Sequence, residues 1–234
     1  MTKISSPDIQ FNFDGKDYFV VDGFQKHFFI KERAKRYSGG LKILSDRLAR
    51  SYGVEEILLK PNDIIVDVGA NVGDFALYLQ RFHEIEYFGF EPSPQEFELL
   101  SRNLPNNFKI YDKIVSDEDS QIRFYVSTAN ADSSIYKSAI TDKELYLKAV
   151  RLDSIFTSIT LLKIDAEGAE VEVIKGAEKI LENIRYIAVD LGFEKGLNHE
   201  TTCPDVINYL LGKNFRILKF TTRNCFLLQN NRFK

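Results

Sequence analysis

Ile64-Ile-Val-Asp-Val-Gly-Ala-Asn-Val-Gly73 is the stretch of sequence that decides the fold. The apolar run that ends at Val68 is typical of a buried strand, and Gly69 and Gly73 allow the chain to turn tightly after it. A helix is expected to start near Asp74, with that side chain as its cap. In an open sheet of parallel strands, ligands bind where such strand ends meet. The stretch therefore predicts a strand, a binding loop and a helix.

Downstream of this stretch, short apolar runs alternate with segments of helical periodicity. The expected strands are 64–68, 85–90, 108–115, 161–164, 186–191 and 215–220, and the expected helices are 74–82, 94–104, 170–182 and 203–212. This alternation predicts right-handed βαβ units and a mostly parallel sheet with helices on both faces, an α/β fold. Residues 121–127 predict an extra strand, and residues 225–229 predict a terminal antiparallel hairpin.

The residues before the sheet have a different pattern. Residues 9–21 predict a hairpin around Asp14-Gly15, and Leu41–Ser51 predict a helix. We therefore expect a small appendage of hairpin and basic helices at 1–60 and a ligand-binding domain at 61–234.

Two polar or glycine-rich segments are candidates for a lid over the ligand. They are the break at Ser38-Gly39-Gly40 and the loop at 128–136. Their composition favours flexibility. An ordinary connecting loop is an equally good interpretation of each segment.

Length and composition bound the class of protein. With 234 residues and 44% hydrophobic residues, the chain can bury the core of one α/β domain with an appendage. No apolar run of membrane-spanning or signal-peptide type occurs, so we expect a soluble, cytoplasmic protein without a transmembrane segment. Cys203 and Cys225 lack paired spacing, which predicts reduced thiols and no metal site.

Charge is unevenly distributed. The net charge of −3 argues against a nucleic-acid partner. Residues 26–50, however, hold eight Lys or Arg side chains against Glu32 and Asp46, a local charge of +6. A solvated helix face is the simpler interpretation. The alternative is a rim that attracts an anionic acceptor.

The charges beside the glycine loop distinguish between ligands. A nicotinamide or flavin site needs Gly-x-Gly-x-x-Gly, and here Asn71 takes the place of the middle glycine. The Asp67 carboxylate is unfavourable beside a pyrophosphate and favourable beside an ammonium and a sulfonium. S-adenosylmethionine carries both cations. We therefore predict that Asp67, Gly69, Asn71 and Gly73 bind S-adenosylmethionine.

Two further strand ends are candidates for the rest of this ligand. Glu91-Pro92 ends the second strand, 24 positions after Asp67, where an acid can accept both ribose hydroxyls. Ser116-Asp117 follows the third expected strand and is a candidate for flanking the adenine, with a polar turn as the near-equal alternative.

The fourth expected strand ends in Lys163-Ile-Asp-Ala-Glu-Gly-Ala-Glu170, where charged residues crowd one edge of the sheet. Glu170 opens the next helix and is most simply a charge that complements the helix dipole. Asp165 and Glu167 remain as candidates for chemistry or binding.

These strings resemble a known family. Asp67–Gly73, Phe90-Glu-Pro-Ser93 and Lys163–Glu170 look like the signature of the FkbM family of methyltransferases, and so do Ser133-Ser134, Arg151-Leu-Asp153 and Ile174-Lys-Gly-Ala177. The resemblance spans about 63–192. It implies the Rossmann-like seven-stranded methyltransferase fold. It also implies methyl transfer from S-adenosylmethionine, usually to a hydroxyl oxygen of a sugar, glycan or polyketide. One departure is Asp190, where such proteins often carry glutamate.

A hydroxyl is a poor nucleophile unless a base removes its proton during transfer. The candidates are Asp165, Glu167, Asp190 and His199. We favour Asp165, as base or as the acid that orients the acceptor, because it caps the strand nearest the donor and so also belongs to the cofactor site. An exposed loop position is the better interpretation of His199. A divalent ion shared by the three carboxylates is a further alternative.

Two functions from other classes stay open beside an O-methyltransferase that releases S-adenosylhomocysteine. A nicotinamide-dependent oxidoreductase would need the full glycine motif, which is missing. A non-catalytic adenosyl-binding module would keep Asp67, Gly69 and Glu91 without the acids after the fourth strand, which this chain has.

Overall fold

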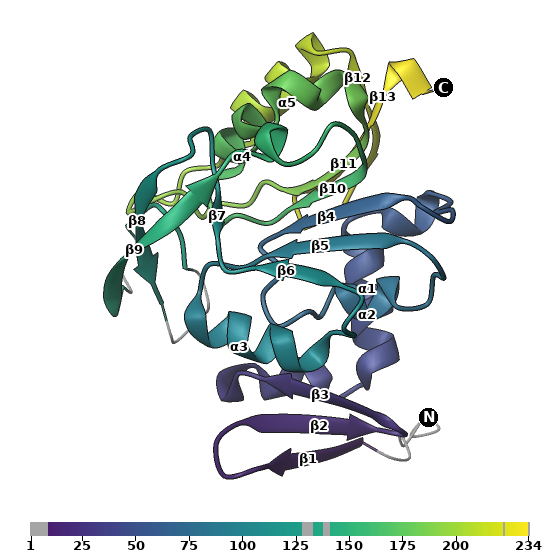
Figure 1. Cartoon of the computed structure of the whole chain (residues 1–234), viewed down its shortest axis with the longest axis vertical. Helices are drawn as coiled ribbons and strands as arrows, with labels where there is room; N and C mark the ends of the chain where they lie inside the picture. Colours follow the sequence, from purple (N-terminus) through teal and green to yellow (C-terminus); the bar gives the residue numbers. More distant parts are fainter. Residues whose placement is uncertain (1–8, 128–132, 138–140, 222, 234) are drawn as a thin grey trace.

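The computed structural model describes residues 9–127, 133–137, 141–221 and 223–233. Its centre is a seven-stranded sheet in the order β12-β13-β11-β10-β4-β5-β6 (Figure 1). The strands are β4 (Ile64–Val68), β5 (Glu86–Phe90), β6 (Lys109–Tyr111), β10 (Ile159–Ile164), β11 (Ile184–Asp190), β12 (Phe215–Phe220) and β13 (Cys225–Asn230). Only β13 runs against its neighbours in this sheet. The predicted mostly parallel sheet with an antiparallel terminal hairpin is confirmed.

The strand order reverses between β4 and β10, which are parallel neighbours. Asp67 lies opposite Lys163, and Val68 lies opposite Ile164. The carboxyl ends of the two strands therefore meet at one edge, and the glycine loop lies beside the acidic string that follows β10.

Helices cover both faces of the sheet. On one face lie α4 (Glu170–Gly176), the 3₁₀ segment η4 (Glu178–Asn183) and α5 (Cys203–Gly212), and on the other lie α1 (Leu41–Ser51) and α2 (Ala76–Leu79). The remaining helical segments are α3 (Pro94–Asn103), η2 (Val54–Glu56), η3 (Leu152–Ser154) and η5 (Asn231–Phe233).

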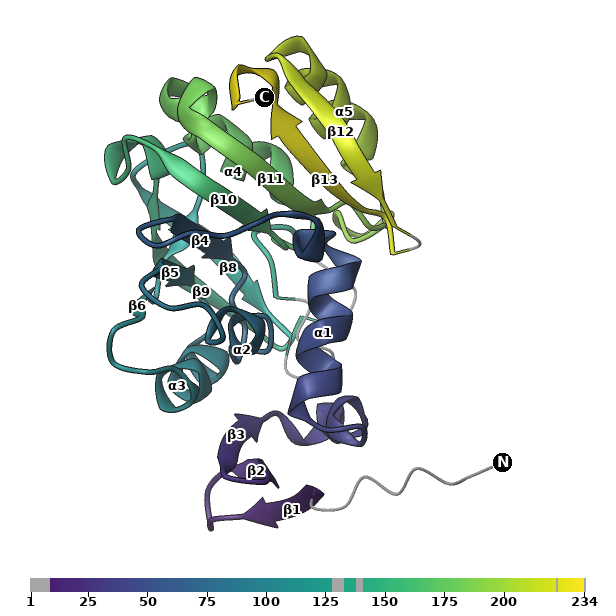
Figure 2. The same cartoon turned by 90° about the vertical axis from the view of Figure 1, so that its right-hand side faces the viewer.

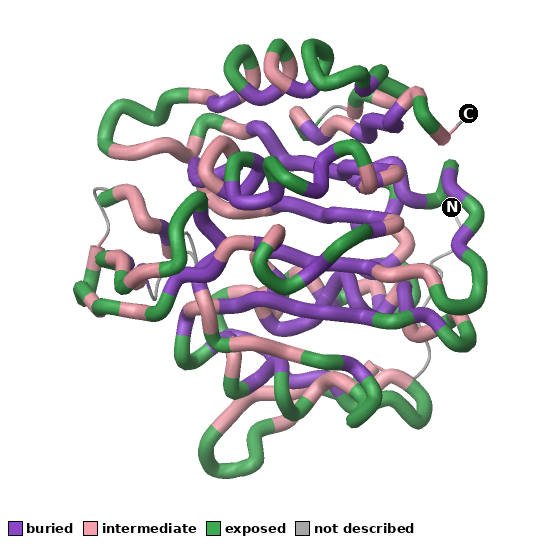
Figure 3. The backbone as a smooth tube through the Cα atoms, turned by 45° about the horizontal axis from the view of Figure 1, so that its top comes forward, coloured by how far each residue is buried: buried purple, intermediate pink, exposed green. Residues whose placement is uncertain are grey.

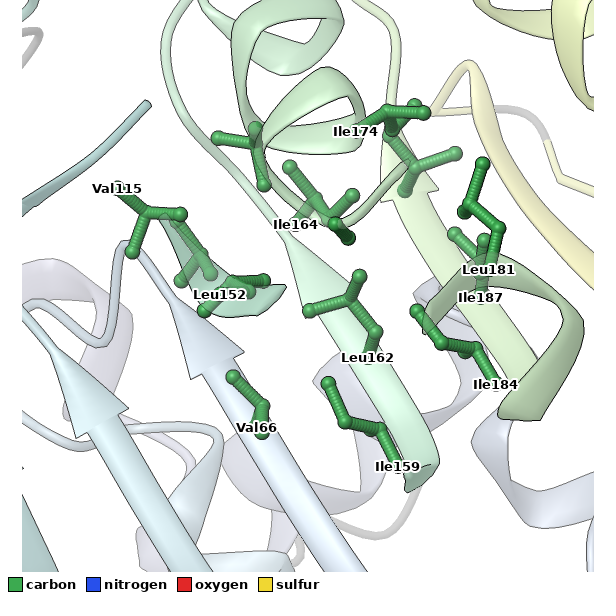
Figure 4. Packing of buried hydrophobic residues seen from close by; sticks show 14 of the residues in the cluster. Val66, Val115, Leu152, Ile159, Leu162, Ile164, Ile174, Leu181, Ile184 and Ile187 are labelled. Atoms are coloured by element: carbon green, nitrogen blue, oxygen red, sulfur yellow. The ribbon is translucent and has the colours of Figure 1, made fainter. Parts of the chain in front are cut away.

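The core consists of alternating side chains of the central strands. Val66 and Leu162 belong to one hydrophobic cluster with Ile174 of α4 and Leu181 of η4 (Figure 4), whereas the neighbouring strand residues point to the opposite face. Most residues of the central strands are buried (Figure 3). Each fully buried aliphatic side chain stabilises the fold by about 1.5–3 kcal/mol, so the sheet is a firm platform for the loops at its edge.

The N-terminal residues form a separate antiparallel sheet and a helical connection. The sheet consists of β1 (Ile9–Phe13), β2 (Tyr18–Asp22) and β3 (Gln25–Phe29), and the 3₁₀ segment η1 (Lys31–Tyr37) leads to α1. The predicted hairpin and the helix at 41–51 are confirmed, but β3 was not expected. Figure 2 shows α1 between this small sheet and the central one. Phe29 and Tyr37 share a hydrophobic cluster with strand β4.

Some predicted elements are wrong in detail. The strand expected at 108–115 divides at Asp112-Lys113 into β6 and β7 (Ile114–Val115). β7 leaves the central sheet and pairs with β9 (Lys143–Val150), an unpredicted strand that also pairs with β8 (Gln121–Val126).

The helix expected at 170–182 also divides, after Gly176. A Cβ at Gly176 would lie 2.1 Å from the carbonyl oxygen of Ser116, so α4 presses its backbone against β7 at this point. The helix expected at 74–82 is shorter, covering Ala76–Leu79. Within the described ranges, every helix is too short or too polar to cross a bilayer.

Candidate active site

A cavity of about 550 Å³ opens at the carboxyl ends of β4, β5, β10 and β11. Its size is within the range of small-molecule sites. Of the predicted site residues, the described wall includes Gly69, Asn71, Glu91, Pro92, Asp165, Glu167 and Asp190. It does not include Asp67, Gly73, Ser116, Asp117 or His199.

Gly69 allows the loop to pack against the end of β10. Its φ is +74°, and a Cβ there would lie 1.9 Å from the carbonyl oxygen of Asp165. No other residue fits this position without moving the backbone. The amides of Gly69 and Ala70 both donate to the carbonyl of Phe90 at 3.0 Å. The loop is therefore held between the ends of β5 and β10.

Glu91 is fixed at the cavity wall by backbone donors. Its two carboxylate oxygens accept hydrogen bonds from the amides of Asn71 and Ser93, both at 2.8 Å. Burial, together with the charge of Glu96, raises the pKa of Glu91 to about 8. The site thus presents a rigid carboxyl group at the tip of β5.

Asp67 lies beneath the loop and not on the cavity wall. Its side chain is fully buried, accepts a hydrogen bond from the Tyr87 hydroxyl at 2.8 Å and lies 3.0 Å from Nζ of Lys163. The expected direct contact with cationic groups of a ligand does not fit this geometry. The physical reason is that Lys163, opposite it in the sheet, already neutralises the carboxylate.

Lys163 connects this buried pair to the glycine loop. Its Nζ donates to the carbonyl of Gly69 at 2.9 Å, and the residue also lines the cavity. Burial lowers the pKa of Lys163, but the charges of Asp67 and Asp165 outweigh it, so the pKa lies above its ordinary value. Lys163 therefore holds the loop as a cation. The sequence singled out the string that contains it but assigned it no role.

Asp165 receives a hydrogen bond from an unexpected residue. The hydroxyl of Tyr52, at the end of α1, donates to Oδ2 of Asp165 at 2.6 Å, and Nζ of Lys163 lies 3.9 Å from the same oxygen. Burial, together with Asp165, raises the pKa of Tyr52 well above its ordinary value, so the phenol remains a donor. Oδ1 of Asp165 has no hydrogen bond to any residue that the structure describes.

Two other predicted acids lie on the same wall. Burial and the charge of Asp165 raise the pKa of Asp190, whose Oδ2 lies 3.3 Å from Sγ of Cys225. Glu167 has a left-handed φ of 49°, and its carbonyl accepts a hydrogen bond from Ser134. Across the described ranges, no three His, Cys, Asp or Glu side chains are arranged to hold a metal ion. The geometry does not support the shared divalent ion.

Glu170 occupies the first turn of α4, as expected, and also stabilises the loop before it. Its Oε1 accepts a hydrogen bond from the amide of Gly168 at 2.9 Å, and its Oε2 accepts one from the Thr202 hydroxyl at 2.7 Å.

Several predicted positions lie elsewhere for identifiable reasons. Gly73 (φ +90°) faces the apolar side chains of Leu100 and Leu104 and so provides close packing of the loop on α3. Ser116 and Asp117 follow β7, which carries them away from the cavity towards Gly176.

His199 is exposed in the loop after β11, as the simpler interpretation held, and is not placed as a base. The residues that line the cavity near this point are instead Lys113, which lies between β6 and β7, and Ile114 and Val115 of β7.

Asp74 does not cap α2. Its Oδ1 lies 2.9 Å from Nε2 of His27 and accepts a hydrogen bond from the Tyr37 hydroxyl at 2.8 Å. Burial raises the pKa of Asp74, but the hydrogen bond and charge of His27 outweigh it and the pKa is lowered. The contact ties the N-terminal segment to the exit of the glycine loop.

The basic segment 26–50 sends three side chains to the cavity. They are Arg33, Arg36 and Arg47, and Arg33 donates to the Asn71 side chain at 2.7 Å. Other cations of the segment are on the outer surface, such as Lys42, which pairs with Asp46. The solvated-face interpretation therefore applies to only part of the segment.

One of the two lid candidates contributes residues to the cavity wall. Ser133, Ser134 and Ile135 line the cavity, whereas residues 128–132 of the same expected loop lie outside the described residues. The break at 38–40 connects η1 to α1. Closure over the site remains a prediction for both.

The family model and the similar proteins that match this sequence are all methyltransferases. A family model for the methyltransferase FkbM domain matches residues 67–217. The 2-O-methyltransferase NoeI of Sinorhizobium fredii is 25% identical over 182 residues, which cover 68% of this chain and 75% of the relative. The 31-O-demethyl-FK506 methyltransferase FkbM of Streptomyces tacrolimicus is 28% identical over 176 residues, which cover 58% of this chain and 66% of the relative.

A solved structure supports the fold. The crystal structure of a methyltransferase FkbM from Methylobacillus flagellatus superposes with a TM-score of 0.53 at 18% identity. The match covers 82% of this chain and 51% of the other, so this chain spans about half the length of that protein.

Proposed function

This chain belongs to the FkbM family of methyltransferases, and we propose that it methylates a hydroxyl oxygen with S-adenosylmethionine as donor. The acceptor class that we propose is a sugar, a glycan or a related natural product. The names of two relatives, a 2-O-methyltransferase and a 31-O-demethyl-FK506 methyltransferase, favour an oxygen acceptor.

The cavity wall fits the donor. When bound, S-adenosylmethionine supplies a methyl group on a sulfonium, which is open to in-line displacement. We assign Glu91 to the two ribose hydroxyls, because its oxygens are acceptors and backbone amides hold the carboxyl group rigidly. Gly69 allows the loop to lie directly against the end of β10, since a Cβ there would meet the carbonyl oxygen of Asp165. Arg33, bonded to Asn71 in that loop, is the cation we assign to the donor carboxylate.

The buried pair beneath the loop contributes indirectly. Asp67 and Lys163 compensate each other's charge, so neither a free carboxylate nor an uncompensated cation faces the donor. Lys163 instead fixes the carbonyl of Gly69 and thereby the shape of the loop. We assign both as positioning residues.

Asp165 is the base that we propose for the acceptor hydroxyl. Oδ2 is held by Tyr52, and Oδ1 is left for the acceptor proton. Proton removal during transfer makes the hydroxyl a competent nucleophile. Asp190, whose pKa is raised by burial and by the charge of Asp165, is the alternative base on the same wall.

One observation carries the proposal: Glu91 at the tip of β5 and Asp165 at the tip of β10 line the same cavity on either side of the glycine loop. Transfer of a labelled methyl group from S-adenosylmethionine to a panel of sugars and glycans tests it. A chain that binds the donor but neither transfers nor slowly hydrolyses it would instead be a non-catalytic module. A chain that binds reduced nicotinamide cofactor in its place would be an oxidoreductase.

A further inference from the structure

We propose that Arg36 and Arg47 form a subsite for an anionic group, a carboxylate or a phosphate, on the acceptor. The inference rests on the proposed function, because it concerns the second ligand of the same cavity. Both side chains line that cavity, and they come from different elements, η1 and α1.

Arg36 faces the cavity because of the geometry of η1. Side chains three residues apart in a 3₁₀ helix lie on the same side, so Arg33 and Arg36 point in one direction. Arg33 is engaged with Asn71 of the glycine loop. Arg36 makes no hydrogen bond or salt bridge to a described residue, although its charge acts on Asp74, which His27 and Tyr37 already satisfy.

Arg47 is on the side of α1 that faces the base. Leu48 and Tyr52 of the same helical segment also line the cavity, and Tyr52 holds Asp165. The carbonyl of Arg47 accepts a hydrogen bond from the Ser51 hydroxyl, but its guanidinium makes no hydrogen bond or salt bridge within the described ranges. Neighbouring cations are paired differently: Lys42 and Arg81 share Asp46, away from the cavity wall.

Charge balance favours the acceptor as the missing partner. The donor has one carboxylate, to which we assigned Arg33, and its ammonium and sulfonium give it a net positive charge. Arg223, the other arginine on the wall, lies among Tyr52, Cys225, Asp190 and Asp165. Burial lowers its pKa, but the charges of these groups outweigh burial and raise it. The donor therefore has no second anionic group that could pair with Arg36 and Arg47. Guanidinium groups bind carboxylate and phosphate in a bidentate manner, and two of them lining one cavity suit an anionic acceptor.

NMR titration of arginine Nε–Hε signals tests the subsite in protein saturated with S-adenosylhomocysteine. The probes are acetate for a carboxylate, inorganic phosphate for a phosphate, and methyl glucoside as a neutral control. We expect one anion to shift the signals of Arg36 and Arg47 saturably, and the tighter anion identifies the class. R36Q and R47Q should each weaken that anion about tenfold, as for loss of a charge-assisted hydrogen bond.

The matched controls remove the same charge from the same elements. Lys35 and Arg50 are exposed neighbours that do not line the cavity, so K35Q and R50Q should leave anion binding within about twofold. No saturable shift with either anion, or equal loss in the controls, overturns the subsite. Calorimetry with S-adenosylhomocysteine on the same samples separates the two proposals. A protein that does not bind S-adenosylhomocysteine overturns the donor site. A protein that binds S-adenosylhomocysteine but neither anion overturns only the subsite.

Discussion

The hydroxyl of Tyr52 donates a 2.6 Å hydrogen bond to Oδ2 of Asp165, across 113 positions of sequence. The contact joins the end of α1 to the end of β10. A residue from the N-terminal segment therefore takes part in the acidic site of the sheet, and this segment is more than a covering element.

Removal of this hydrogen bond should impair catalysis and not donor binding. In Tyr52→Phe we expect turnover to fall about tenfold to a hundredfold, as for loss of a hydrogen bond to a charged group. The pH–rate profile, measured beside turnover, reports whether the loss acts through the Asp165 carboxylate. Tyr78→Phe, on α2 outside the cavity wall, is the matched control. A profile and turnover that match this control would refute a positioning role for Tyr52.

Asp165→Asn tests the base itself. Turnover should fall by about 10²–10⁴, the usual contribution of a general base, while the affinity for S-adenosylhomocysteine stays within a few-fold. The measurement is single-turnover transfer of a labelled methyl group beside calorimetry. Unchanged turnover would rule Asp165 out. A parallel loss of donor affinity would instead assign it to cofactor binding.

Donor affinity should depend on the protonation of Glu91. Its pKa of about 8 means that the carboxyl group is mostly protonated at pH 6 and ionised at pH 9. The ionised form accepts both ribose hydroxyls, so affinity for S-adenosylhomocysteine should rise with pH by up to about tenfold per unit below pH 8 and then level off. Calorimetry from pH 6 to 9 follows this. Glu91→Gln should bind weakly with a flat profile, and a wild-type profile that is equally flat would contradict the assignment.

Lys163→Met should destabilise the fold, because it leaves the Asp67 carboxylate buried and uncompensated. We expect a loss of about 3–5 kcal/mol in the free energy of unfolding, measured with urea. The exposed pair of Lys213 and Glu178 offers a control, since Lys213→Met should cost about 0–1 kcal/mol. Adding Asp67→Asn to Lys163→Met should recover part of the loss. Equal effects at the two lysines would show that the buried pair is not what holds the loop.

The alternation of strands and helices and the edge of the sheet that holds the site were predictable from the sequence. The apolar runs around Val66, Leu162 and Ile187 are buried on both faces of the sheet and are therefore continuous, which makes them easy to recognise. Gly69 and Glu91 followed from the same logic, because a binding site lies at the ends of such strands.

Other parts depend on contacts that no local pattern contains. Tyr52 looks like an ordinary residue at a helix end, and its partner is 113 positions away. Asp67 has the residue type expected of a ligand contact, but its neighbour across the sheet, Lys163, neutralises it. The strand at 108–115 divides because β7 pairs with β9, a partner that only the fold brings near.

Calorimetric titration with S-adenosylmethionine, run beside reduced nicotinamide cofactor, tests the central claim most directly. We expect one molecule of S-adenosylmethionine to bind per chain, no binding of the nicotinamide cofactor, and a loss of about tenfold or more in Glu91→Gln. Binding of the nicotinamide cofactor without S-adenosylmethionine, or donor binding that is unaffected by Glu91→Gln, would contradict the account.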